Sequence, residues 1–207
     1  MRLDPACTRC GLCKGRENVV APEGPRRARV VLVGEAPGQK EDQLGRPFVG
    51  RAGKMLDRIM AEQGVSRSEV LITNTVKCRP PRNRRPTEKE TDECFPYLEQ
   101  ELKGRAMVVA MGKTAAENLL QRPVKMADVA NCDFYVEIMG IKTRVVPTYH
   151  PSAAMYNLRS REALGRTMKL VRSELDSPGS ASSRGTSRSS IRPPKRKASP
   201  RRRGGGR

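Results

Sequence analysis

The chain has 207 residues, and its 41 Lys or Arg residues against 22 Asp or Glu residues give a formal net charge of +19 at pH 7. This length fits one domain with an appendage, and the charge indicates a polyanionic partner such as nucleic acid. No apolar run is long enough to span a membrane, and no signal peptide precedes the first cysteines. A cytoplasmic protein without membrane attachment (or a nuclear one, in a eukaryote) is therefore expected.

The basic residues are concentrated at one end of the chain. Residues 177–207 hold ten Lys or Arg and no acidic residue, which leaves 31 basic against 22 acidic residues, a net +9, in residues 1–176. The end segment is rich in Ser, Pro, Gly and Arg, so it buries too little surface to fold alone. We predict a folded domain over 1–176 and a disordered basic tail over 177–207. The tail either solubilises the protein or, as we prefer, binds DNA nonspecifically through counterion release.

The six cysteines, in a reducing compartment, are more often ligands than disulfides. Cys7, Cys10 and Cys13 lie close together near the start, and fifteen residues separate Cys78 from Cys94. Four thiolates from these two segments could hold a structural zinc or an iron–sulfur cluster, and their spacing does not separate the two. Buried free cysteines are the alternative. The polar, glycine-containing segment around Cys7 and Cys10 favours ligands, and Cys13 is left over.

An apolar, β-branched run at Val30–Val33 predicts a buried strand. The strand leads into Gly34–Gly38, where glycine and proline force a tight turn that leaves backbone N–H groups pointing outward. A polar loop with Glu41 follows, and then Phe48, the first aromatic residue of the chain, in a glycine-framed GRPFVG segment. A lone aromatic residue in such a loop suits a stacking surface. The alternative is that it fills a small satellite core.

The rest of the chain alternates between helical and strand patterns. Apolar periodicity predicts helices over about 52–60, 87–102, 113–120 and 160–175, and strands over 70–74, 106–111 and 142–148. Thr87 and Glu90 form the pattern of a capping box at the start of the second helix. This alternation predicts an α/β fold with a mostly parallel, four-stranded sheet and helices on both faces.

Polar residues lie at the carboxyl ends of three of the predicted strands, namely Glu35, Asn74 and His150. The carboxyl ends of parallel strands form the ligand-binding edge of such a sheet. A single histidine at a strand end is more often structural. Because His150 is the only histidine in the chain and shares its predicted edge with an amide and a carboxylate, we favour a functional site.

Five motifs in this order carry a resemblance to a known family: GEAPG with a following ED (34–42), GRPFVG (45–50), ITN (72–74), CRPPRNRRP with its later cysteine (78–94) and HPSA (150–153). They resemble the iron–sulfur uracil-DNA glycosylases, family 4 of that superfamily, over about residues 7–173. The resemblance implies a three-layer α/β/α fold and a DNA repair enzyme that acts as a monomer on single- or double-stranded DNA. Such an enzyme flips uracil out and hydrolyses its N-glycosidic bond, leaving an abasic site. It also implies a [4Fe–4S] cluster, with the ligands Cys7, Cys10, Cys78 and Cys94.

The resemblance assigns substrate-binding roles as well. Phe48 stacks on the flipped base beside Gly34, and the Asn74 amide offers a donor and an acceptor that match the O4/N3–H edge of uracil but not of cytosine. Ser152 and Met155 are expected to enter the DNA minor groove, with Met155 as a wedge.

The implied catalytic residues are Glu35, Glu41 and His150. His150 donates a hydrogen bond to uracil O2 as negative charge develops there. Glu35 stabilises the sugar cation or orients the attacking water, and Glu41 pairs with Asn83 to hold the loop. Ala36 stands where the better-known branch of the superfamily has a water-activating Asp, so the mechanism must differ.

Two other classes of function compete with this interpretation. One is a non-catalytic nucleic-acid-binding protein with an iron–sulfur or zinc site, for which Glu35, Phe48 and His150 need not share a pocket. The other is a nucleotide-binding enzyme whose 34–38 turn holds phosphate. The second is disfavoured because no lysine follows the turn as in a P-loop and G-x-G-x-x-G is absent from the sequence.

Overall fold

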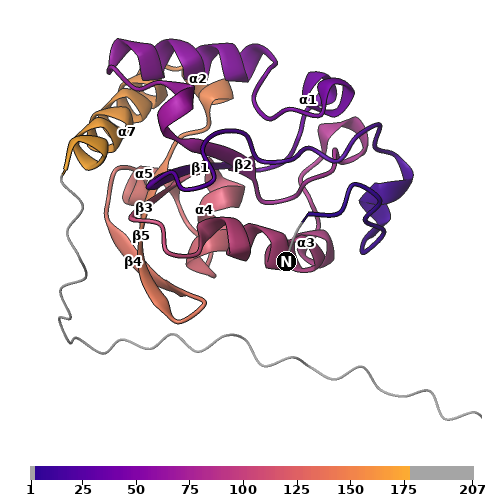
Figure 1. Cartoon of the computed structure of the whole chain (residues 1–207). Helices are drawn as coiled ribbons and strands as arrows, with labels where there is room; N and C mark the ends of the chain where they lie inside the picture. The colour runs from indigo at the N-terminus through magenta and orange to yellow at the C-terminus, as the bar shows by residue number, and fades with distance from the viewer. Residues whose placement is uncertain (1–2, 178–207) are drawn as a thin grey trace, which may run out of the picture.

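The computed structural model describes residues 3–177 and contains a five-stranded sheet with the order β2-β1-β3-β5-β4 (Figure 1). β1 (Val30–Gly34) pairs in parallel with β2 (Leu71–Asn74) and β3 (Met107–Met111), and β3 pairs in parallel with β5 (Ile141–Thr148). All residues of β1, β2 and β3 are buried, as expected of parallel strands covered on both faces. The tail predicted over 177–207 lies outside the described residues, apart from Ser177.

The sheet has five strands, so the prediction of four was one short. The missed strand, β4 (Phe134–Ile138), lies at the edge and pairs antiparallel with β5. A two-residue turn joins the two strands, with positive φ at both Met139 and Gly140, the conformation typical of a tight hairpin. The mostly parallel character of the sheet is confirmed.

Helices cover both faces of the sheet (Figure 1). On one face, α2 (Arg51–Glu62), α6 (Pro151–Ala154) and α7 (Leu158–Asp176) pack against alternate residues of the central strands. On the other face lie α3 (Glu88–Leu102), α4 (Lys113–Leu120) and α5 (Met126–Val129). The α/β architecture and its helix-covered sheet are therefore confirmed.

The remaining elements are short. They are α1 (Gln39–Leu44) and the 3-10 turns η1 (Gly11–Lys14), η2 (Arg67–Glu69) and η3 (Pro81–Asn83). The expected capping box begins α3: Glu90 N–H donates to Thr87 Oγ1 over 3.3 Å, and Thr87 N–H donates to Glu90 Oε2 over 2.8 Å. Within residues 3–177, none of the helices has the length and apolarity that a membrane crossing requires.

Candidate active site

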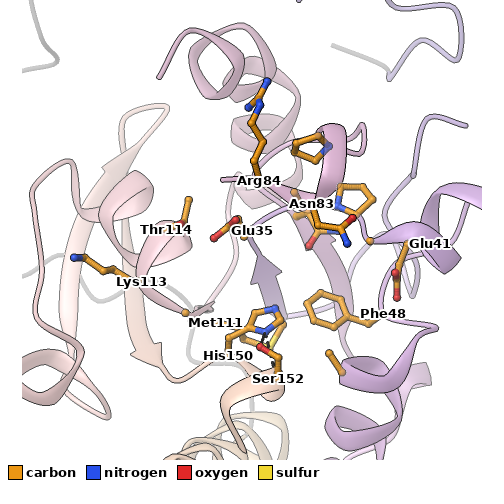
Figure 2. Close-up of a pocket in the computed structure, with 17 residues that line it drawn as sticks. Glu35, Glu41, Phe48, Asn83, Arg84, Met111, Lys113, Thr114, His150 and Ser152 are labelled. Carbon is orange, nitrogen blue, oxygen red and sulfur yellow. Dashed lines mark hydrogen bonds between the residues drawn. The ribbon is translucent and has the colours of Figure 1, made fainter. Parts of the chain in front are cut away.

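A pocket of about 470 Å³ opens at the carboxyl ends of β1, β2, β3 and β5. It is lined by residues from the loops that follow each of these strands (Figure 2). Seven of the residues predicted from the sequence are among them: Glu35, Glu41, Phe48, Asn74, Asn83, His150 and Ser152. The chain therefore brings together segments that lie more than a hundred residues apart in the sequence.

Gly34 shapes the pocket without lining it. It pairs with Asn74 across β1 and β2, and a Cβ atom at this position would lie 2.4 Å from Asn74 Oδ1 and 2.5 Å from Phe48 Cζ. Any side chain larger than hydrogen would displace both neighbours. Asn74 itself is only 3% exposed, and no described residue hydrogen-bonds to its side-chain amide. Its donor and its acceptor are thus left for a ligand in the pocket.

Phe48 belongs both to the core and to the pocket. Its side chain is 5% exposed and packs in the cluster under α2 and α7, while its ring also lines the pocket. Its ring centroid lies 5.8 Å from that of His150, with the ring planes inclined by 34°, and Figure 2 shows the two rings side by side. The backbone of Phe48 has a φ of +52°, a left-handed conformation that a bulky residue rarely adopts. A pocket-facing aromatic ring is therefore held by the core behind it.

Glu41 holds the loop that carries Phe48. Its Oε1 accepts hydrogen bonds from the N–H groups of Val49 (2.9 Å) and Gly50 (2.7 Å). The pairing expected between Glu41 and Asn83 is not formed in the described structure. The side-chain amide oxygen of Asn83, Oδ1, accepts instead from Arg79 Nε over 2.8 Å. Glu41 thus keeps its expected loop-holding position but with different partners.

His150 caps the short helix α6 with its own ring. The Ser152 N–H donates to His150 Nδ1 over 3.2 Å, and Ser152 Oγ lies 2.8 Å from the same atom. A ring nitrogen that accepts from a backbone N–H is unprotonated, so the neutral imidazole carries its proton on Nε2. Burial lowers the pKa of His150 from 6.5 to about 4, and the nearby negative charge of Glu41 only partly offsets this effect. Ser152 therefore orients the imidazole.

The wedge role expected of Met155 in the DNA minor groove stays a prediction. Met155 is half-buried and does not line the pocket. Close to it, Tyr156 is 76% exposed and Leu158 is 70% exposed. Leu158 lies outside the buried stripe of α7, which includes Ala163 and Leu164. Leu158 does not follow the apolar periodicity of α7. This mismatch is visible in the sequence and could have identified Leu158 as an exposed apolar residue, but it was missed.

Two cationic residues near the pocket were also missed, Arg84 and Lys113. Arg84 donates to both carboxylate oxygens of Glu90, over 2.8 and 2.6 Å, and this interaction contributes most to lowering the pKa of Glu90 to about 2. Lys113 begins α4, directly after the end of β3. The position of Lys113 shortly after a predicted strand was the signal in the sequence that could have identified it.

One small cavity beside α3 is lined by all four predicted ligands, Cys7, Cys10, Cys78 and Cys94. Cys13 lines the same cavity. In the described part of the chain, no group of three or more His, Cys, Asp or Glu side chains has an arrangement that could hold a metal ion. The donors around the sulfurs are nevertheless those that metal-bound thiolates accept.

Three groups donate toward three different sulfurs. Tyr97 Oη lies 3.5 Å from Cys7 Sγ, Arg16 Nη1 lies 3.4 Å from Cys78 Sγ, and Lys77 N–H lies 3.3 Å from Cys94 Sγ. Burial raises the pKa of the Cys94 thiol to about 11, so this thiol stays protonated at neutral pH unless a metal takes the place of the proton. The set of donors fits a thiolate-bound cluster.

Comparison with known proteins connects this geometry to a family. Residues 21–171 match the family model of the uracil DNA glycosylase superfamily. The chain is 42% identical to the type-4 uracil-DNA glycosylase of Saccharolobus solfataricus over 178 residues, which cover 83% of this chain and 82% of the relative. It is 43% identical to the type-4 enzyme of Pyrobaculum aerophilum (72% and 79% covered) and 40% identical to that of Archaeoglobus fulgidus (80% and 86% covered). This chain belongs to the uracil-DNA glycosylase superfamily.

Proposed function

We propose that this protein is a DNA repair glycosylase that flips uracil out of DNA and hydrolyses its N-glycosidic bond, leaving an abasic site. One observation carries the proposal: a stacking ring, a base-recognising amide and a neutral imidazole, from Phe48, Asn74 and His150, share one pocket at the carboxyl edge of the sheet. The membership of the superfamily and the type-4 relatives support it.

The pocket offers the contacts that a flipped uracil needs. Phe48 presents a ring face, and stacking on it replaces part of the stacking that the base loses when it leaves the duplex. The Asn74 amide can donate to uracil O4 and accept from N3–H. Cytosine presents an amino group and an unprotonated N3 at these places, so each contact with Asn74 would be reversed. The same amide thus binds uracil and disfavours cytosine.

His150 stabilises the leaving group. As the glycosidic bond breaks, negative charge develops on uracil O2, and the Nε2–H of the neutral imidazole donates a hydrogen bond to it. The Ser152 N–H holds Nδ1 as an acceptor and so fixes this tautomer. Because the pKa of His150 is lowered to about 4, the imidazole is neutral over the whole physiological range. It therefore acts as a hydrogen-bond donor without first gaining a second proton.

Glu35 is the carboxylate that acts on the sugar cation and on the attacking water. Figure 2 shows its side chain directed into the pocket, on the side away from Phe48. A negative charge there stabilises the cation-like sugar and can orient the attacking water. Ala36 has no group that could activate water. Glu41 contributes indirectly, since it holds the Phe48 loop through the Val49 and Gly50 N–H groups.

We propose a [4Fe–4S] cluster on Cys7, Cys10, Cys78 and Cys94, supported by the cavity that they share and by the donors around their sulfurs. Such a cluster, when bound, supplies a covalent link between segments that are distant in the sequence. Two of its ligands precede β1, and the others lie after β2 and in α3. Its proposed role is structural, because these cysteines do not line the pocket of His150.

The proposed DNA contacts lie around Ser152 and Met155, extended by the two exposed apolar residues Tyr156 and Leu158. We propose uracil-containing DNA, single- or double-stranded, as the partner. The basic tail over 177–207 would add nonspecific affinity for phosphate. A monomeric state and a cytoplasmic location remain predictions.

The test is incubation of the purified protein with single- and double-stranded oligonucleotides that contain one uracil, followed by alkaline cleavage at abasic sites. We expect strand cleavage at the uracil position and none with thymine or cytosine at the same place. DNA binding without release of uracil would instead support the non-catalytic alternative and would overturn the proposal.

A further inference from the structure

Arg67 lies outside the pocket and contacts the backbone of the loop that contains Phe48. Its Nη2 donates to the carbonyl oxygen of Phe48, and its Nη1 lies 3.3 Å from the carbonyl oxygen of Pro47. Arg67 belongs to the 3-10 turn η2, before β2, and does not line the pocket. The guanidinium therefore reaches the base-stacking residue only through its main chain.

The backbone of Phe48 needs external support. Its φ of +52° lies in the left-handed region, which is unfavourable for a bulky residue unless the surroundings impose it. On one side, Glu41 accepts from the N–H groups of the two residues that follow. On the other side, a Cβ at Gly53 would lie 1.8 Å from the Phe48 carbonyl oxygen, so α2 approaches this peptide closely. Arg67 Nη2 supplies the hydrogen bond that this carbonyl accepts.

Arg67 is itself fixed by carboxylates from two other segments. Its Nε lies 2.5 Å from Asp57 Oδ1 on α2, and its Nη1 lies 3.3 Å from Glu23 Oε1. Its side chain is 25% exposed, which is low for an arginine on a surface turn. The planar guanidinium is needed here, because a lysine ammonium cannot serve two backbone carbonyls and two carboxylates from one fixed plane.

We propose that Arg67 is a positioning residue for uracil recognition, which sets the orientation of the Phe48 ring through the Phe48 carbonyl. This inference rests on the proposed function of the pocket, and in particular on the stacking role of Phe48. It identifies a determinant of uracil excision that touches neither the base nor the reacting atoms. A small displacement of the ring is enough to affect the rate, because misplacement by about 1 Å can cost up to about 10²-fold.

A double-mutant cycle tests the proposal. Single-turnover excision of uracil from single-stranded DNA is measured for the wild type, Arg67→Lys, Phe48→Ala and the double variant. We expect Arg67→Lys to slow excision by about 10-fold in the wild-type background and by less than about 2-fold in the Phe48→Ala background. Arg58→Gln is the matched control and should leave the rate unchanged, since Arg58 lies on α2, is exposed and, among the described residues, pairs with Glu62 alone.

Two further measurements separate positioning from general damage. The free energy of unfolding of Arg67→Lys, measured by chemical denaturation, should be high enough to keep the variant folded under assay conditions. Its affinity for DNA should stay within about 2-fold of that of the wild type. An equal loss of rate in both backgrounds, or no loss in either, would overturn the role of Arg67 while leaving the proposed function intact. A wild-type protein that releases no uracil would overturn both.

Discussion

The protonation of His150 gives the sharpest quantitative prediction. Its pKa is about 4 in the folded protein, against 6.5 for a histidine exposed to water. Between these values the unfolded chain binds a proton that the folded protein does not. The contribution of His150 to stability is therefore fully present above about pH 6.5 and is lost as the pH falls toward 4. Lowering the pH from 7 to 4.5 should cost up to about 2 to 3 kcal/mol of unfolding free energy through this residue.

The expected loss is somewhat smaller, about 2 kcal/mol, because the ring lies at the wall of an open pocket where water partly screens it. Chemical denaturation of the wild type and of His150→Gln at pH 7 and 4.5 measures it, since glutamine does not titrate. The difference between the two proteins should change by about 2 kcal/mol across this range. The carboxylates titrate in both proteins, so their effect cancels to a good approximation in this comparison.

The chain also allows a direct measurement, because His150 is its only histidine. In an NMR titration, its Cε1–H resonance should move with a midpoint near 4. The single-turnover rate of uracil excision should show no inflection near pH 6.5. A midpoint at or above 6.5 would refute the argument that burial keeps this imidazole neutral, and with it the assignment of Nε2–H as a neutral donor.

Four further predictions concern other parts of the chain. Asn74→Asp should slow uracil excision and admit cytosine, measured on matched oligonucleotides, because a carboxylate cannot donate to uracil O4; unchanged rates would mean that Asn74 does not recognise the base. Cys78→Ala should lose the brown colour of anaerobically purified protein and much of its thermal stability, whereas a colourless, fully active wild-type protein containing zinc would contradict the cluster. Lys77→Ala should lower the unfolding free energy by about 3 kcal/mol, measured by chemical denaturation, because the buried Lys77 Nζ lies 2.7 Å from Glu101 Oε2; a loss below about 1 kcal/mol would count against that ion pair. Deleting residues 177–207 should weaken DNA binding and flatten its dependence on salt, with the single-turnover rate unchanged; loss of that rate would make the tail part of the active structure.

Much of the fold could be predicted from the sequence because buried parallel strands are continuous apolar runs with polar residues at their ends. Val30–Val33 and the strand ending at Asn74 are of this kind, and the site at their carboxyl edge followed from the topology. β4 was missed because an edge strand buries only part of its side chains, so its pattern is weaker. A two-residue turn at Met139 and Gly140 was its clearest signal.

The contacts inside the site could not be predicted in the same way. The partners of Glu41 depend on where the Phe48 loop folds back, and that arrangement follows from the close approach of α2 at Gly53 rather than from any local pattern. The role of Arg67 is hidden for the same reason, since its contacts to the Phe48 loop are made to the backbone carbonyls of Pro47 and Phe48, 20 and 19 residues away. Backbone acceptors carry no signature in a sequence.

The central claim is that His150 stabilises uracil as it leaves, in a pocket that Phe48 and Asn74 complete. The most direct measurement is single-turnover uracil excision by His150→Ala, together with its affinity for the same uracil-containing DNA. We predict that the rate falls by roughly 10²- to 10³-fold, the usual cost of losing one anion-stabilising donor, while the affinity stays nearly unchanged. A variant that excises uracil at the wild-type rate would contradict the account.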